Sequence, residues 1–111
     1  MQLPNAINAF IDDRKLTEYC LNPEHEEGKH KARVFASALG ITSEIYFVLK
    51  AAILDAVFSE NALLIKELSC GKLYQVDFEM RYGDKFASVR SGWIILKDED
   101  FPRLTTCFIL N

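Results

Sequence analysis

The chain has 111 residues, half of them hydrophobic and 12% aromatic, and 13 lysines and arginines against 16 aspartates and glutamates give a formal net charge of −3. This composition excludes intrinsic disorder, and the length suits one globular domain, residues 1–111, with no room for a second core. The mild acidic charge excludes steering of the whole molecule onto nucleic acid or an acidic membrane, so RNA binding would need a local basic patch.

The start of the chain and its cysteines indicate a cellular location. The first residues show no basic start and no apolar run of signal-peptide length, and the longest apolar segment is interrupted by Lys50 and Asp55. We therefore expect no export signal, no membrane contact and a cytoplasmic location. Cys20, Cys70 and Cys107 are odd in number and widely spaced, which predicts buried free thiols rather than a disulfide framework.

The first two predicted helices are short. Apolar residues within 16–20 follow the i, i+3, i+4 spacing of a helix, and Pro23 ends that helix because proline disfavours helical backbone in the preceding residue. The same spacing predicts a second helix over 29–39. Gly40 then stands where a left-handed cap ends a helix.

A third, central helix is predicted from about residue 45 to residue 58, with Thr42 or Ser43 as its cap. Its apolar residues cover almost the full circumference instead of one stripe. We therefore expect this helix to be covered on more than one side, by the sheet, by other helices or by a subunit.

After residue 61 the apolar period changes from 3.6 to 2, which predicts strands. Turn residues separate four such runs, at 63–68, 72–82, 86–97 and 104–110. Helices followed by strands indicate an α+β fold, in which two or three N-terminal helices pack on one face of a four-stranded antiparallel β-meander. Tyr74, Phe78 and Tyr82 alternate along the second strand and form either its core face or a platform for stacking bases.

The segment 22–33 is the strongest candidate for chemistry, because it combines His25 and His30 with Lys31 and two further cations. Histidine can move a proton near neutral pH, and lysine can hold a phosphate oxygen. The alternative is a solvated, charged loop. The two histidines are five residues apart, and CxxC, HExxH, GxSxG, P-loop and GxGxxG motifs are missing, so we expect no metal and no cofactor.

The chain is similar to a family of small, largely uncharacterised bacterial domains with a pattern close to LPNA…KL..YLLNP.H..G..KA..F…LG and a later VRT.WII…PRLVTAYP. The matching segments are 3–6, 15–19, 21–25, 31–33, 39–40, 89–90, 93–95 and 102–104, with Gly28 and Phe35. Domains of this family occur alone and at the ends of large polymorphic toxin proteins.

The expected order of elements also resembles the ribonuclease architecture of barnase, EndoU, colicin-type and RelE-type toxins, an analogy of fold only. It implies metal-independent RNA cleavage, with proton transfer at the ribose 2′-hydroxyl and cations around the phosphate. On the matching positions, His25 would be the general base or acid, Lys31 and Arg90 would bind phosphate, and Thr106 would donate a hydroxyl. His30 is a further candidate for proton transfer.

The carboxy terminus departs from the family pattern. Where the family reads Thr-Ala-Tyr-Pro, residues 106–109 read Thr-Cys-Phe-Ile, and the missing tyrosine hydroxyl argues against catalysis. Ser91 replaces the threonine of Val-Arg-Thr and keeps a hydroxyl. Thr106 also shares strand parity with Leu104 and Phe108, so a core-facing position is the alternative to a site role.

Two hypotheses follow. The first is a toxin-type ribonuclease acting on RNA through a local basic patch, which requires His25, Arg90 and Thr106 to meet in one cleft. The second is a non-catalytic protein-binding module of the immunity, antitoxin or adaptor kind, or a homodimer. That module would use the apolar central helix or a sheet edge as its interface, and its acidic charge suits a basic partner.

Overall fold

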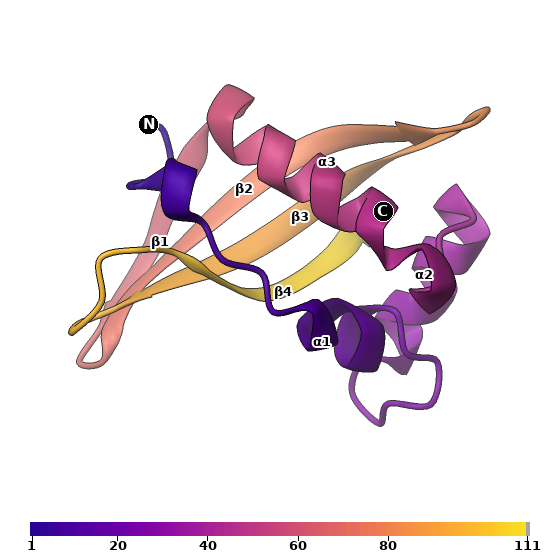
Figure 1. Ribbon diagram of the computed structural model, residues 1–111, viewed down its shortest axis with the longest axis horizontal. Helices are drawn as coiled ribbons and strands as arrows, with labels where there is room; N and C mark the ends of the chain where they lie inside the picture. Colours follow the sequence, from indigo (N-terminus) through magenta and orange to yellow (C-terminus); the bar gives the residue numbers. More distant parts are fainter. Residues whose placement is uncertain (111) are drawn as a thin grey trace.

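The helices come first in the chain and the strands follow (Figure 1), as the computed structural model describes for residues 1–110. The helical part comprises η1 (Ala6–Asn8), α1 (Asp13–Lys15), η2 (Leu16–Cys20), α2 (Lys29–Leu39), η3 (Ser43–Ile45) and α3 (Tyr46–Ser59). The strands are β1 (Ala62–Leu68), β2 (Gly71–Tyr82), β3 (Lys85–Leu96) and β4 (Arg103–Leu110). None of the described helices is long and apolar enough to cross a bilayer.

The four strands form one antiparallel sheet in the order β1-β2-β3-β4, so the expected α+β fold and meander are confirmed. The β2–β3 hairpin closes at Gly83-Asp84, where Tyr82 pairs with Lys85. Near the chain start, Phe10 forms a parallel bridge with Arg103 beside β4. The residues before α1 are thereby held at the same edge of the sheet as β4.

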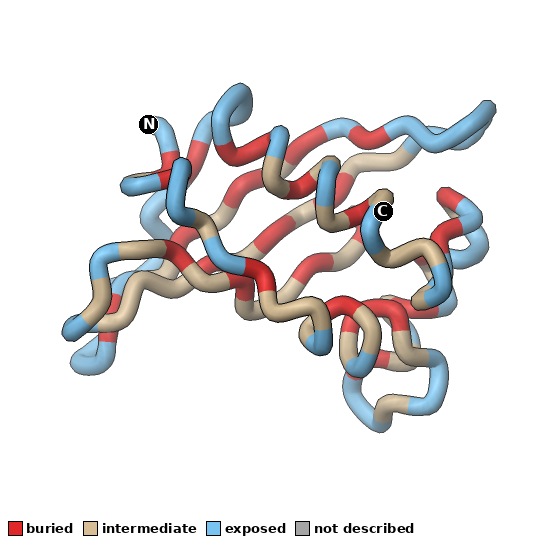
Figure 2. Tube along the Cα trace, viewed as in Figure 1, coloured by how far each residue is buried: buried red, intermediate tan, exposed pale blue. Residues whose placement is uncertain are grey.

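The core lies between α3 and one face of the sheet (Figures 1 and 2), and α3 packs mainly on β2. Even positions of β2 from Tyr74 to Met80 are buried, so the stripe of Tyr74 and Phe78 is the core face rather than an open stacking platform. Tyr82 lies beyond this core at the exposed end of the hairpin. Alternation along a half-buried strand thus explains these aromatic residues.

The prediction for α2 is confirmed at both ends. Gly40 has φ +69°, in the left-handed region, and its N–H donates to the carbonyl of Ala36. The next N–H, of Ile41, donates to the carbonyl of Phe35, which completes a Schellman-type end. Residues with a Cβ are strained at such a φ, so glycine at position 40 determines where α2 stops.

Two other helix predictions need correction. The segment before Asn22-Pro23 contains α1 followed by the π-helical turn η2, in which the N–H of Leu21 donates to the carbonyl of Leu16. At the start of the central helix, Thr42 caps nothing, because its hydroxyl donates to Glu44 and the 3₁₀ turn η3 leads into α3. A local side-chain bond has therefore replaced the expected cap.

The expected burial of the cysteines is confirmed for Cys20 and Cys107 and wrong for Cys70. Cys70 lies in the β1–β2 turn and is exposed to solvent. Cys107 is in β4 beneath η2, where contact with the Cys20 thiol and burial raise its pKa. All three thiols are free.

Candidate functional site

Arg90 on β3 and Thr106 on β4 line the same hollow, of about 260 Å³, on the sheet face opposite α3. Leu73 and Phe108 supply apolar walls. The Arg90 guanidinium is held by Asp77 through two hydrogen bonds of 2.9 and 3.0 Å, and this pairing raises the Arg90 pKa. The charge that would bind phosphate is therefore already matched by a carboxylate.

The core-facing alternative for Thr106 is wrong, because the register between β3 and β4 shifts. Gly92 pairs with Thr106, whereas the next residue of β3, Trp93, pairs with Leu104, so Thr105 is an extra residue in β4. Because of this bulge, Thr106 does not lie on the same face of the sheet as Leu104, although the two are two residues apart. The Thr106 Oγ1 atom is itself buried and has no hydrogen-bond partner among the described residues. In this position it cannot donate to a phosphate.

Lys31 and His30 lie at a second hollow, of about 350 Å³, beside α2. The Lys31 ammonium donates a 2.9 Å hydrogen bond to the hydroxyl of Tyr19 and lies 5.8 Å from the ring centre of Phe108. Phe108 borders both this hollow and the one containing Arg90. Lys31 therefore lies next to the sheet face opposite α3, and its ammonium is hydrogen-bonded to Tyr19.

His25 lies at a third hollow, of about 430 Å³, together with Lys15 and Tyr19. Its Nδ1 atom accepts hydrogen bonds of 3.0 Å from the backbone N–H groups of Glu27 and Gly28, and its ring meets Tyr19 edge-on with centres 4.9 Å apart. The imidazole therefore braces the loop at the start of α2. The sequence analysis did not single out Tyr19, whose side chain contacts both His25 and Lys31. Its signal was the tyrosine of the family pattern, four residues after Lys15.

Arg90 and Thr106 line one hollow, and His30 and Lys31 line another. The structure does not bring His25, Arg90 and Thr106 into one cleft. The requirement of the ribonuclease hypothesis is not met. Within residues 1–110, no group of three or more histidine, cysteine, aspartate or glutamate side chains is arranged to hold a metal ion.

The outward face of α3 carries an apolar stripe that the chain leaves largely uncovered. Phe47, Ala51 and Phe58 are exposed at i, i+4 and i+11, and the phenylalanines are 58% and 53% exposed; Leu54, at i+7, is half-buried and packs against the core. The opposite side of the helix is buried in the core. The expected cover on more than one side is thus missing from this chain on its own.

The β1 edge of the sheet is a weaker candidate interface. β1 is exposed along nearly its whole length, including Leu63 and Ile65. Its pairing shifts register between Leu64 and Lys66, and Lys66 and Glu67 are exposed. Bulges and charges of this kind protect natural sheet edges against further strand pairing.

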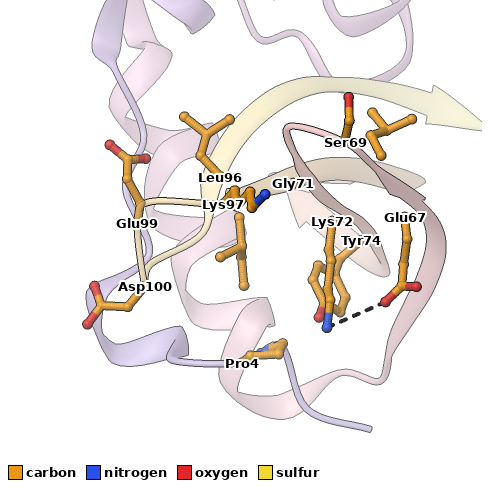
Figure 3. Close-up of a pocket in the computed structure, with 12 residues that line it drawn as sticks. Pro4, Glu67, Ser69, Gly71, Lys72, Tyr74, Leu96, Lys97, Glu99 and Asp100 are labelled. Carbon is orange, nitrogen blue, oxygen red and sulfur yellow. Dashed lines mark ion pairs between the residues drawn. The ribbon is translucent and has the colours of Figure 1, made fainter.

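A cleft of about 650 Å³ lies at the end of the sheet where the β1–β2 turn meets the β3–β4 connection (Figure 3). Pro4 from the first segment closes one side. Sequence reasoning did not predict this cleft. Its walls come from three segments far apart in the chain, and no motif marks them.

Comparison with known proteins identifies the family of this chain. The family model described as "Domain of unknown function (DUF6883)" matches residues 2–111, so the chain belongs to this family. No curated protein and no solved structure matches the chain.

Proposed function

We propose that this member of the DUF6883 family is a non-catalytic protein-binding module that docks a partner on the outward face of α3. The observation that carries the proposal is the stripe of exposed Phe47, Ala51 and Phe58 with half-buried Leu54, on a helix whose other side is buried in the core. Contiguous exposed apolar side chains of this kind are typical of interaction surfaces, and aromatic residues are enriched there.

The charges beside this stripe indicate what kind of partner it suits. Asp55 and Glu60 are exposed on and just after α3, and neither forms an ion pair within the described residues. The one cation on the helix, Lys50, is already paired with Asp13 at 2.6 Å. With a net charge of −3, the chain presents apolar anchors beside unmatched carboxylates. A partner with an apolar patch and basic residues at its rim is complementary to this face.

The test compares the wild type with a variant that carries Phe47→Ser and Phe58→Ser. Both side chains are exposed, so the variant should keep its fold, which circular dichroism checks. Phe86→Ser is the matched control, because Phe86 is 74% exposed at the far hairpin. A partner captured from cells would be identified, purified and mixed with each variant.

We expect the partner to form a binary complex with the wild type and with Phe86→Ser at similar affinity. Its affinity for the Phe47→Ser/Phe58→Ser variant should be at least tenfold lower. That figure is about 1.4 kcal/mol, less than the roughly 1.5–3 kcal/mol for burying one phenylalanine. Equal binding by the double variant contradicts the proposal.

A second candidate is the metal-independent ribonuclease. Because Thr106 and His25 do not take the roles expected for them, this candidate rests on two cations: Arg90 lies at the hollow on the sheet face opposite α3, and Lys31 lies 5.8 Å from the ring centre of Phe108 at the border of that hollow. The test is incubation with total RNA at low salt without metal, beside His25→Ala and Arg90→Gln. A binding module leaves the RNA intact. Cleavage by the wild type that is lost in Arg90→Gln would favour the nuclease, and persistence of cleavage in His25→Ala would remove His25 from its mechanism.

A further inference from the structure

The face of the sheet opposite α3 carries apolar side chains of its own. Ile65 on β1 is 53% exposed, and Leu73 on β2 and Phe108 on β4 are half-buried. All three border the hollow of about 260 Å³ that also contains Arg90. In an antiparallel sheet the face turned away from the core is commonly polar, so apolar side chains around a hollow on that face indicate an interaction surface.

Gly92 lines this hollow from the middle of the sheet, where it pairs with Gln75 on β2 and with Thr106 on β4. A Cβ at position 92 would lie 3.1 Å from the Thr105 Oγ1 atom and 3.2 Å from the Thr106 Cγ2 atom, which is tighter than ordinary contact. Glycine inside a strand often marks a place where another molecule approaches closely. The missing side chain thus leaves room on the sheet for a group from outside.

Phe86 is an exposed aromatic residue on the same face of the same strand. Val89 and Trp93 are buried on the core side of β3, and the pairing with β2 has no register shift, so Phe86 and Gly92 share the opposite side. Phe86 is 74% exposed near the end of the β2–β3 hairpin, which Figure 2 shows as exposed. Six residues at about 3.4 Å each place it roughly 20 Å from Gly92, too far to cover that glycine in its own chain.

We infer that two copies of this chain pack face to face through these sheet faces, with Phe86 of each copy seated on Gly92 of the other. A two-fold axis that runs the two β3 strands antiparallel makes both insertions at once, which is the closed arrangement of a symmetric dimer. Because α3 lies on the other face of the sheet, both α3 stripes stay outward in this dimer. The inference therefore does not depend on the proposed docking partner.

The charges on this face suit a second copy. On this side, β2 and β3 carry the carboxylates of Asp77 and Glu79 and the guanidinium groups of Arg81 and Arg90. Asp77 and Arg90 are paired, whereas Glu79 and Arg81 form no ion pair among residues 1–110. Glu79 pairs across the strands with Ser88, and the two-fold arrangement sets Ser88 opposite Arg90 of the second copy. A free carboxylate thus faces a guanidinium across the interface, which favours self-association.

The test is sedimentation equilibrium over a wide range of protein concentration, with circular dichroism as the check on folding. The wild type should form a dimer. Phe86→Ser should weaken that dimer by about a hundredfold or more, because each dimer loses two buried phenylalanines. Tyr82→Ser is the matched control, since Tyr82 is an exposed aromatic residue at the same hairpin end but shares the parity of buried Met80, on the α3 side. It should dimerise as the wild type does.

A photochemical experiment locates the contact. Benzoylphenylalanine in place of Phe86 is irradiated in a mixture of isotopically labelled and unlabelled chains, and the cross-linked peptides are mapped. The expected attachment lies within 90–92 or 105–108 of the other copy. The Phe47→Ser/Phe58→Ser variant should dimerise normally, so its failure would move self-association to α3 and contradict the inference. The inference is also overturned if the wild type is monomeric at every concentration, if Phe86→Ser or Tyr82→Ser behaves like the other, or if the cross-links fall elsewhere.

Discussion

The indole N–H of Trp93 donates a 2.9 Å hydrogen bond to the hydroxyl of Ser91, two residues earlier on β3. That hydroxyl donates in turn to the carbonyl of Val76 on β2, at 2.8 Å. Both side chains are fully buried. This short polar chain satisfies an indole inside an apolar core, and it explains why a hydroxyl is needed at position 91.

Ser91→Ala should lower the free energy of unfolding by about 1–3 kcal/mol, because the buried indole N–H loses its acceptor. Urea unfolding followed by tryptophan fluorescence measures the change. Ser37→Ala, at an exposed position of α2, is the control and should stay within about 0.5 kcal/mol of the wild type. Equal stability of the two variants would show that the indole does not depend on Ser91.

His25→Ala should destabilise the chain by about 0.5–2 kcal/mol, the range for loss of a helix cap, because two N–H groups at the start of α2 lose their acceptor. His30 is exposed on α2, so His30→Ala should be nearly neutral. Thermal unfolding of both variants distinguishes them. The same effect from either change would contradict a bracing role for His25.

Asp12 gives the protein part of its acid sensitivity. Its side chain accepts hydrogen bonds from the guanidinium and the N–H of Arg14, and these lower the Asp12 pKa from 3.8 to about 2. Since the folded pKa lies below the unfolded one, this stabilisation is present above about pH 4 and is lost as the pH falls toward 2. Asp12→Asn should therefore lower Tm at neutral pH and reduce its fall between pH 4 and 2.

The control for this prediction is Asp55→Asn, which removes an exposed carboxylate on α3 that forms no ion pair in the described chain. It should leave the acid dependence of Tm close to that of the wild type. The role of Asp12 would be refuted if Asp12→Asn showed the same fall of Tm with acid as the wild type.

The three thiols should differ in reactivity. Cys70 is exposed, whereas Cys20 and Cys107 are buried and Cys107 has a raised pKa, which disfavours its reactive thiolate. A thiol reagent such as dithionitrobenzoate should modify one cysteine in the native protein and all three in denaturant. Cys70→Ser should abolish the rapid native reaction. Rapid reaction of more than one thiol would mean that β4 and η2 separate readily.

Local sequence was sufficient for most of the architecture. The bounds of α2, the end at Gly40 and the order of four hairpin-linked strands follow from apolar periodicity and turn residues, which act over a few positions. The resemblance to a family of uncharacterised domains, drawn from short sequence segments, was likewise confirmed by the match to the DUF6883 family. These features need no knowledge of which distant segments meet.

Contacts between segments far apart in the chain determined the positions of the candidate site residues and the surfaces left exposed. The extra residue Thr105 in β4 turns Thr106 away from the core, and the looping of 22–28 around Tyr19 places His25 apart from Arg90. Neither the exposed side of α3 nor the hollow at Gly92 could be read from spacing, because each depends on which faces the packed segments leave open. Periodicity determines which face of an element is apolar, and only tertiary packing determines whether that face is covered.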